Sequence, residues 1–216
     1  MFYDITKRII DIVASICLII FFSPIMIVTA IIIKLTSSGP ILVEKTSPHM
    51  KRIGRDGRVF RLYKFRSMYV NAAHLLTKDP RFRKLYSEYK KSSFKLHRDP
   101  RVTKFGKFIR KYSIDEMPQL FNVLRGEMSL VGPRPYHADE LEEQQKRYPY
   151  AQKYVKETQT VKPGITGYWQ VTGRSEVNFD KRIRMDAEYA KKKSIVFDLM
   201  ILLKTPWAMI SGKGAV

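Results

Sequence analysis

The chain has 216 residues, of which 44% are hydrophobic, which suits one domain with a sizeable core and excludes global disorder. Forty Lys and Arg residues against twenty Asp and Glu residues give a formal net charge of +20, so the expected partners are anionic: nucleic acid, acidic phospholipid or phosphorylated small molecules. The single cysteine, Cys17, excludes an intramolecular disulfide framework and indicates a reducing compartment.

The first predicted element is a membrane segment. No charged residue occurs in the 22 positions from Ile12 to Ile33, which is long enough for a membrane helix. The run is too long for the h-region of a cleavable signal peptide, and no small-x-small cleavage site follows it. We expect residues 1–36 to form a membrane anchor and residues 37–216 to form the remaining domain.

Ser23 and Pro24 lie near the middle of this segment. Pro24 lacks an N–H and clashes with the carbonyl of Ile20, so an ideal helix is expected to be interrupted there. Each arm is then roughly 18 Å long, against about 30 Å for the hydrocarbon core. Basic residues on both flanks favour placing both ends at the cytoplasmic face. A re-entrant hairpin broken at Ser23-Pro24 and a kinked spanning helix both remain open.

A β-hairpin is predicted next. Asp56-Gly57 is a type I′ turn signal between two strand-like runs, and the second run extends from Val59 to Arg66. Alternation along that strand places Lys64 and Arg66 on one face, so two cations are predicted to point at one spot. The basic run around them also suits a solvated or lipid-facing edge.

Residues 71–111 alternate helical patches with Pro80 and Pro100 and are dense in Lys and Arg. We expect this segment to lie against anionic phospholipid headgroups. The four histidines share no metal-ligand spacing, so none is assigned to a metal.

Two adjacent carboxylates, Asp115 and Glu116, follow this segment. Ser113 and Glu116 fit a capping box, which would make them structural. Pro118 argues against that register, because it would remove a hydrogen bond inside the helix. With Pro118 at its first position, the helix runs through Leu124 or Arg125 and stops near Gly126. The carboxylates then precede a helix N-terminus, which attracts phosphate and lowers carboxylate pKa values, so they are candidates to attack phosphorus or bind Mg²⁺.

Arg134 lies between two prolines in the sequence GPRP. Both prolines restrict the backbone, so the guanidinium is presented with little conformational freedom left to lose. A planar fork suits bidentate phosphate binding, although a structural ion pair is an equal alternative. Together with the acid pair, Lys64, Arg66 and the anchor, Arg134 suggests phosphoryl transfer at a bilayer surface.

The last third contains Tyr168-Trp169, which suits either nucleotide or sugar contacts or core packing, and a hydrophobic segment over residues 194–210. We expect that segment to lie in the membrane interface plane with Trp207 at headgroup level. An ordinary core helix is the alternative, and Pro206 is predicted to break either one.

Three motifs carry a family resemblance: KFRSM from Lys64, DEMPQLFNVLRGEMSLVGPRP from Asp115, and PGITGYWQVTGRS from Pro163. In this order they resemble the bacterial sugar transferase family, the monotopic phosphoglycosyl transferases. The resemblance implies an α+β, mostly helical fold with a re-entrant membrane helix hairpin. It also implies a catalytic domain with a small β-hairpin and interfacial amphipathic helices, on the cytoplasmic face of the bacterial inner membrane.

The resemblance further implies an activity: transfer of a sugar 1-phosphate from a UDP-sugar to undecaprenyl phosphate, with release of UMP. The sugar would be galactose, glucose or an N-acetylated hexosamine, and the step would initiate capsule, exopolysaccharide or O-antigen synthesis. Asp115 would be the nucleophile and a Mg²⁺ ligand, forming an aspartyl-phosphosugar intermediate, and Glu116 would assist the metal or the acceptor. The implied anion partners are Lys64, Arg66, Arg110 and Arg134.

Two other functions suit part of the sequence. A membrane-tethered nucleic-acid-binding protein suits the charge, but no helix-turn-helix, zinc or RNA-binding motif appears, so no nucleic-acid partner is expected. A non-catalytic assembly factor for polysaccharide export is disfavoured, because the motif acids and Arg134 are all present. The sequence leaves a homo-oligomer open.

Overall fold

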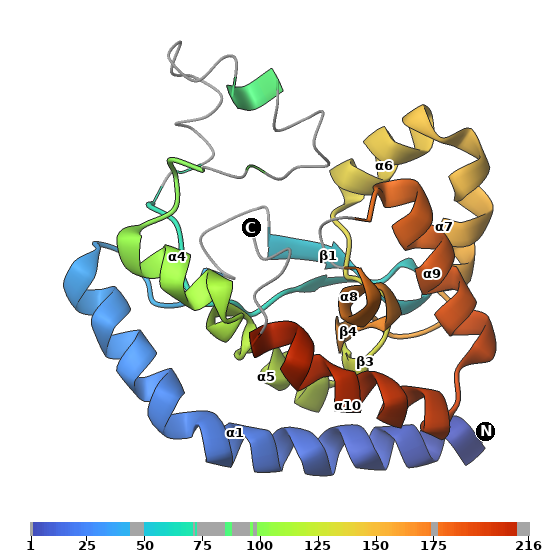
Figure 1. Ribbon diagram of the computed structural model, residues 1–216, viewed down its shortest axis with the longest axis horizontal. Helices are drawn as coiled ribbons and strands as arrows, with labels where there is room; N and C mark the ends of the chain where they lie inside the picture. The colour runs from blue at the N-terminus through green and yellow to red at the C-terminus, as the bar shows by residue number, and fades with distance from the viewer. Residues whose placement is uncertain are drawn as a thin grey trace.

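The computed structural model describes residues 2–43, 50–70, 72, 85–87, 96, 99–173 and 177–210. Most of residues 71–98, the first part of the basic segment 71–111 predicted to contact lipid headgroups, and residues 174–176 of the last motif lie outside these ranges. The described chain is mostly helical and contains two small two-stranded sheets (Figure 1). This confirms the predicted mostly helical α+β class.

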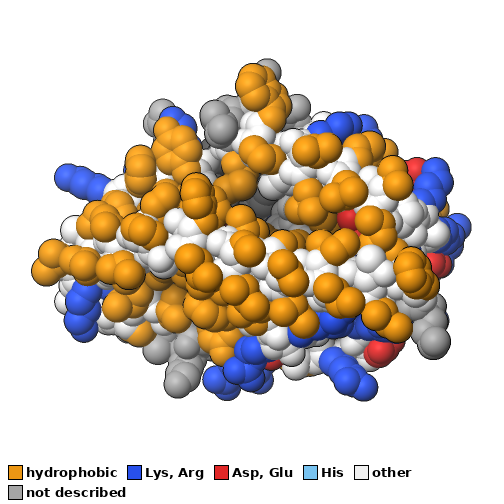
Figure 2. Space-filling view, turned by 90° about the horizontal axis from the view of Figure 1, so that it is seen from below, with side chains coloured by type: hydrophobic (Ala, Val, Ile, Leu, Met, Phe, Trp, Pro, Cys, Tyr) orange, Lys and Arg blue, Asp and Glu red, His pale blue; other side chains and the backbone are white. Residues whose placement is uncertain are grey.

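Helix α1 (Phe2–Thr36) is the longest element, and it is long and apolar enough to cross a membrane. Figure 1 shows it running along the lower edge of the molecule and then turning upward beside α4. Its first part packs on the main core through Ala14, Leu18 and Ile19. Seen from below, hydrophobic side chains gather over this face (Figure 2). The exposed hydrophobic residues of α1 include Ile16 and Ile20. The helix therefore has one apolar side on the domain and another uncovered.

Pro24 lies inside α1, and the helix continues on both sides of it. The hydroxyl of Ser23 donates a 2.8 Å hydrogen bond to the carbonyl of Ile20, which Pro24 leaves without its backbone donor. This replacement bond explains why the helix is not interrupted. The predicted break between two separate helices is wrong in that respect, since α1 bends but does not end at Ser23-Pro24.

Strands β1 (Lys51–Ile53) and β2 (Val59–Arg61) form the predicted antiparallel hairpin. Asp56 and Gly57 have φ values of 56° and 73°, and the Arg58 N–H donates to the Arg55 carbonyl at 3.1 Å. These features confirm the type I′ turn. Strand β2 ends at Arg61 and not at Arg66. The backbone N–H groups of Tyr63 and Phe65 donate to Asn122 Oδ1 and to the Asp115 carbonyl instead of to a neighbouring strand.

The acid pair lies between two helices. Helix α4 (Lys104–Lys111) is followed by the 3₁₀ turn η4 (Ile114–Glu116) and helix α5 (Gln119–Arg125). Pro118 precedes α5, and Gly126 ends it in a left-handed conformation with φ 80°. The predicted stop at Gly126 is therefore confirmed, and the helix starts at Gln119, one residue after the predicted Pro118. The Ser113 side chain makes no capping hydrogen bond, so the capping box does not form.

The remaining elements build the core above α1. Strand β3 (Ser129–Val131) pairs in parallel with β4 (Gly164–Thr166), and the connection between them carries helices α6 (Ala138–Arg147) and α7 (Gln152–Thr158). Helices α8 (Tyr168–Thr172) and α9 (Phe179–Lys192) follow. This parallel pair was not predicted, because strands of three residues show no periodicity. It carries the Gly132–Pro135 loop at the end of β3.

Helix α10 (Ile195–Ile210) continues through Pro206, so the prediction that this proline breaks the helix is wrong. A proline one turn from the helix end removes only one hydrogen bond. Ile201 is fully buried in the core, whereas Leu203 and Trp207 are 81% and 77% exposed. Helix α10 therefore covers the core with one side and presents an apolar second side, as predicted for an amphipathic helix.

Candidate active site

The acid pair is held on a strained turn. Ser113 is a non-glycine residue with φ 57°, a conformation that costs about 1–3 kcal/mol and is retained only where the surroundings demand it. The Ser113 N–H donates to the Arg110 carbonyl, and the Glu116 N–H donates to the Ser113 carbonyl. The chain thus reverses after α4 and turns Asp115 inward, where it is 2% exposed.

Lys64 lies against both carboxylates. Its Nζ is 2.8 Å from Asp115 Oδ2 and 3.3 Å from Glu116 Oε1. The exposed fractions of the side chains are 3% for Asp115 and 35% for Glu116. One carboxylate is therefore buried against the lysine, and the other is partly exposed.

The two carboxyl groups have opposite pKa shifts. Burial raises the pKa of Asp115; Lys64 opposes this shift and the Glu116 charge adds to it. Burial also favours a higher pKa for Glu116, but the charges of Lys64, Arg134 and Arg110 outweigh it, so the pKa of Glu116 is lowered. The prediction that both pKa values are lowered is wrong for Asp115. Ionisation of Asp115 depends on Lys64.

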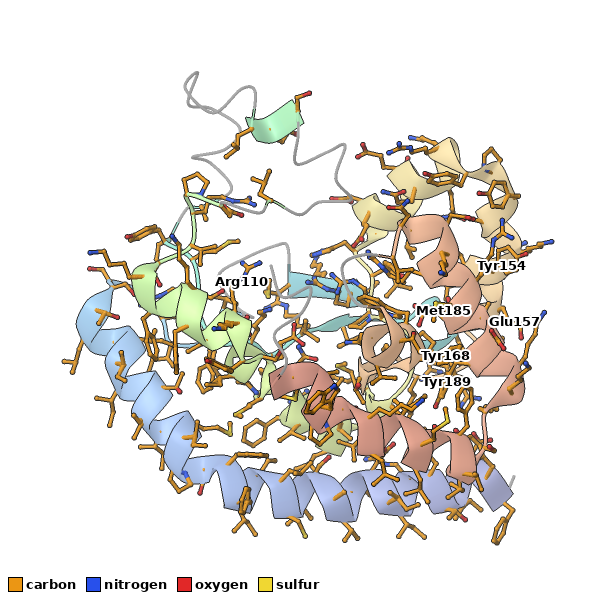
Figure 3. All side chains as sticks on the ribbon, viewed as in Figure 1. Arg110, Tyr154, Glu157, Tyr168, Met185 and Tyr189 are labelled. Carbon is orange, nitrogen blue, oxygen red and sulfur yellow. The ribbon has the colours of Figure 1, made fainter. Side chains whose placement is uncertain are left out.

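Arg110 and Arg134 reach the same site from other elements. Arg110, labelled in Figure 3, belongs to α4; its charge opposes the rise in the pKa of Asp115 and contributes to the lowered pKa of Glu116. Arg134 follows β3, its charge acts on Glu116, and its guanidinium lies 6.0 Å from the centre of the Trp169 ring. Three of the four predicted cations therefore act on the acid pair.

Arg66 is the exception. Its Nη2 donates to the Ser37 carbonyl at 2.6 Å, to Ser37 Oγ at 3.0 Å and to the Ile33 carbonyl at 3.3 Å. These acceptors belong to the C-terminal end of α1 and the residue that follows it. The prediction that Arg66 and Lys64 point at one spot is wrong, because the strand alternation on which it rested ends at Arg61.

Asn122 is a structural residue of the site that the sequence reasoning missed. It is fully buried in α5, and its Oδ1 accepts the Tyr63 N–H at 2.9 Å. Its Nδ2 donates to the Arg61 carbonyl at 2.8 Å and to Glu127 Oε2 at 2.7 Å. These bonds fix the segment that leads into Lys64. Two buried amides three residues apart on α5, Gln119 and Asn122, were the available signal.

Asp186 is a second missed residue, and it supports Arg134. It is fully buried in α9, and its Oδ2 accepts the Arg134 backbone N–H and the Tyr136 hydroxyl, both at 3.3 Å. Burial raises the pKa of Asp186 to about 7. Trp169 is 3% exposed and lies under the Arg182 guanidinium at 4.6 Å, so it packs in the core.

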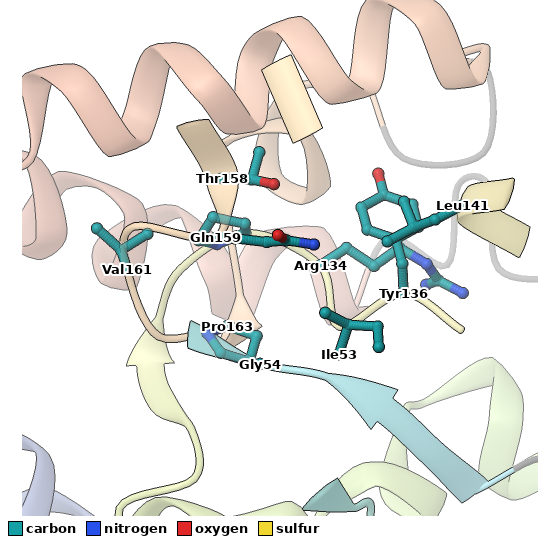
Figure 4. Close-up of a pocket in the computed structure, with 10 residues that line it drawn as sticks. Ile53, Gly54, Arg134, Tyr136, Leu141, Thr158, Gln159, Val161 and Pro163 are labelled. Carbon is teal, nitrogen blue, oxygen red and sulfur yellow. The ribbon is translucent and has the colours of Figure 1, made fainter. Parts of the chain in front are cut away.

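A small pocket lies behind the Arg134 loop (Figure 4). Its lining comes from the end of β1, the loop after β3 and the segment after α7, and includes Ile53, Pro133, Tyr136 and Gln159. Arg134 also lines this pocket, but Lys64 and the acid pair do not. The candidate site is therefore the Lys64, Asp115 and Glu116 cluster and not this pocket.

Comparison with known proteins agrees with the motifs. Residues 2–212 match the bacterial sugar transferase family. The undecaprenyl-phosphate galactose phosphotransferase of Salmonella typhimurium is 45% identical over 97% of this chain and 41% of its own length. The undecaprenyl-phosphate glucose phosphotransferase of Komagataeibacter xylinus is 39% identical over 92% of this chain and 35% of its own length.

A shorter relative matches over most of its length. The exopolysaccharide production protein ExoY of Rhizobium meliloti is 35% identical over 97% of this chain and 87% of its own length. By contrast, the chain spans about two fifths of the Salmonella protein. The match over nearly all described elements shows that this chain belongs to the bacterial sugar transferase family.

Proposed function

We propose that this protein is a phosphoglycosyl transferase that moves a sugar 1-phosphate from a UDP-sugar to undecaprenyl phosphate and releases UMP. The observation that carries the proposal is the buried Asp115 carboxylate, paired with Lys64 at 2.8 Å beside the partly exposed Glu116. The relatives named as undecaprenyl-phosphate galactose and glucose phosphotransferases support the acceptor and the hexose class. The step would initiate a surface polysaccharide such as a capsule, an exopolysaccharide or an O-antigen.

In the first half-reaction, an Asp115 carboxylate oxygen attacks the β-phosphorus of the UDP-sugar. The bond between this phosphorus and the oxygen that bridges it to the α-phosphate breaks, and UMP leaves with that oxygen. The product on the enzyme is an aspartyl-phosphosugar. Lys64 keeps Asp115 ionised for the attack, and Arg110 and Arg134 offset the negative charge of the diphosphate.

In the second half-reaction, a phosphate oxygen of undecaprenyl phosphate attacks the same phosphorus. The bond to Asp115 breaks, which regenerates the carboxylate and gives undecaprenyl diphosphate sugar. Glu116 is ionised, because its pKa is lowered, and its side chain is 35% exposed. It is therefore suited to accept a proton from an incoming acceptor phosphate monoanion.

A Mg²⁺ ion fits this donor set only with help from the substrate. Among the described residues, no group of three or more acidic, His or Cys side chains could hold a metal. Mg²⁺ is commonly held by one or two carboxylates together with substrate phosphates and water. Glu116 is the better placed ligand, because Asp115 Oδ2 contacts Lys64. When bound, Mg²⁺ would neutralise diphosphate charge and improve UMP as a leaving group.

The contacts of α1 support a re-entrant anchor. Near its start, Lys7 Nζ lies 2.8 Å from Asp198 Oδ2 in α10, and near its end Ser37 accepts from Arg66. Both ends of the apolar helix are thus tied to the same domain. A spanning helix would place its ends on opposite sides of the bilayer, so we place the protein monotopically on the cytoplasmic face of the inner membrane.

The proposal is tested with purified protein, Mg²⁺, undecaprenyl phosphate and a panel of UDP-sugars. Wild-type protein should release UMP, and Asp115→Asn should release none while still inserting in membranes. Asp139→Asn, at an exposed position in α6, is the matched control and should match wild type. Release of UDP instead of UMP would contradict phosphosugar transfer, and turnover by Asp115→Asn would remove Asp115 from the nucleophile role.

A further inference from the structure

Residues Lys64 to Arg66 lie between the exit of α1 and the acid turn. On one side, the Phe65 N–H donates to the Asp115 carbonyl at 2.9 Å. On the other side, the Arg66 N–H donates to the Ile41 carbonyl at 2.8 Å, and the Lys64 carbonyl accepts the Val43 N–H at 3.1 Å. This short segment therefore connects the chain leaving the membrane helix to the backbone of the nucleophile.

The Arg66 side chain also binds the end of α1. The last carbonyls of a helix lack intrahelical donors and carry partial negative charge, and the Arg66 guanidinium donates to Ile33 and Ser37 there. Gly39 has φ 118°, and a Cβ at that position would collide with Arg66 Nη1. The chain after α1 is thus shaped around this guanidinium.

The burial of Arg66 argues against a role in binding substrate. The residue is 3% exposed, and its Nε and Nη1 atoms are also buried. Among the described residues, these two nitrogens have no hydrogen-bond partner, and their burial leaves them without solvent exposure for a UDP-sugar diphosphate to contact. Lys64, two residues earlier, is 22% exposed and contacts both carboxylates.

We propose that Arg66 is a positioning residue: it fastens the exit of α1 to the 64–66 segment and so sets the place of Lys64 and of the Asp115 backbone. The membrane anchor is then part of the scaffold that aligns the nucleophile. This inference rests on the proposed function, since its kinetic effect is read in UMP release. A misplacement of about 1 Å is enough to cost about 100-fold in rate.

The test compares Arg66→Met and Arg66→Lys with Arg58→Met, a control at an exposed cation of the hairpin turn. Arg66→Met should lower kcat for UMP release by about 10- to 100-fold and leave KM for the UDP-sugar unchanged, because no substrate contact is lost. Arg66→Lys should recover part of kcat, because an ammonium also donates to helix-end carbonyls. Arg58→Met should behave as wild type.

Amide hydrogen exchange supplies a readout that needs no turnover. In Arg66→Met, exchange at Phe65 and at the acid turn should become faster, and in Arg58→Met it should not. If Arg66→Met does not fold, Ser37→Ala provides a milder version, with kcat lowered by about threefold and KM unchanged. A raised KM with unchanged exchange would show phosphate binding by Arg66 and overturn the inference. Faster exchange in a protein whose wild type releases no UMP would uphold the connection and reject the proposed function instead.

Discussion

Replacing Lys64 by methionine removes the cation 2.8 Å from Asp115 Oδ2 and keeps a long apolar stem. Removing one partner of a buried ion pair costs about 3–5 kcal/mol, because the other charge is left unpaired. Asp115 avoids this cost by taking up a proton, so its pKa, already raised by burial, should rise further. Since about 1.4 kcal/mol is a factor of ten in rate, adduct formation at neutral pH should fall by at least about 100-fold.

The pH dependence distinguishes this cause from loss of substrate binding. Raising the pH increases the ionised fraction of a carboxyl group whose pKa is raised. Single-turnover UMP release by Lys64→Met should therefore increase about tenfold per pH unit below the new pKa of Asp115. Lys64→Arg keeps the charge and should stay close to the wild-type profile. A Lys64→Met profile parallel to wild type at every pH would refute the assignment of Lys64 to the ionisation of Asp115.

Three further outcomes follow from other contacts. Burial raises the pKa of Asp186 to about 7, so the folded state binds this proton more tightly than the unfolded state. The resulting stability is present below about pH 4 and is lost as pH rises through 7. The free energy of unfolding of Asp186→Asn should therefore lack this pH dependence. If the variant kept the wild-type pH dependence, the raised pKa of Asp186 would be contradicted. Asn122→Ala should lower the free energy of unfolding by about 2–3 kcal/mol, because its hydrogen bonds are lost. An unchanged midpoint of urea unfolding would contradict a stabilising role for these bonds. Leu203→Asp should weaken vesicle flotation without unfolding the protein; wild-type flotation would place α10 away from the membrane.

The elements that sequence predicts well depend on local backbone chemistry. Pro118 and Gly126 bracket α5 because one fits the start of a helix and the other permits the left-handed residue that ends it. Asp56-Gly57 forms the expected type I′ turn for a related reason, since both residues tolerate positive φ. These outcomes need no knowledge of distant parts of the chain.

The two proline predictions failed for a reason that is also local. The hydroxyl of Ser23 bonds to the carbonyl that Pro24 leaves without a donor, and Pro206 lies in the last turns of α10. A proline disrupts a helix when the carbonyl four residues earlier, which loses its backbone donor, finds no replacement donor. At Pro24 the preceding residue, Ser23, supplies the replacement bond, and at Pro206 the helix has only one more turn to complete.

The site itself was only partly predictable. Asp115, Glu116 and Lys64 come together as charge and motif suggested, but the raised pKa of Asp115 comes from burial by the whole fold. Arg66 illustrates the limit most clearly. It is two residues from Lys64 in sequence, yet its guanidinium reaches Ser37 at the end of α1, a tertiary contact that no alternation pattern encodes.

The central claim is that Asp115 becomes covalently phosphoglycosylated. The most direct measurement is peptide mass spectrometry of protein quenched with a UDP-sugar in the absence of undecaprenyl phosphate. The account predicts one sugar phosphate on the peptide that carries Asp115, lost when acceptor is added. An unmodified peptide despite stoichiometric UMP release, or an adduct on another residue, would contradict the account.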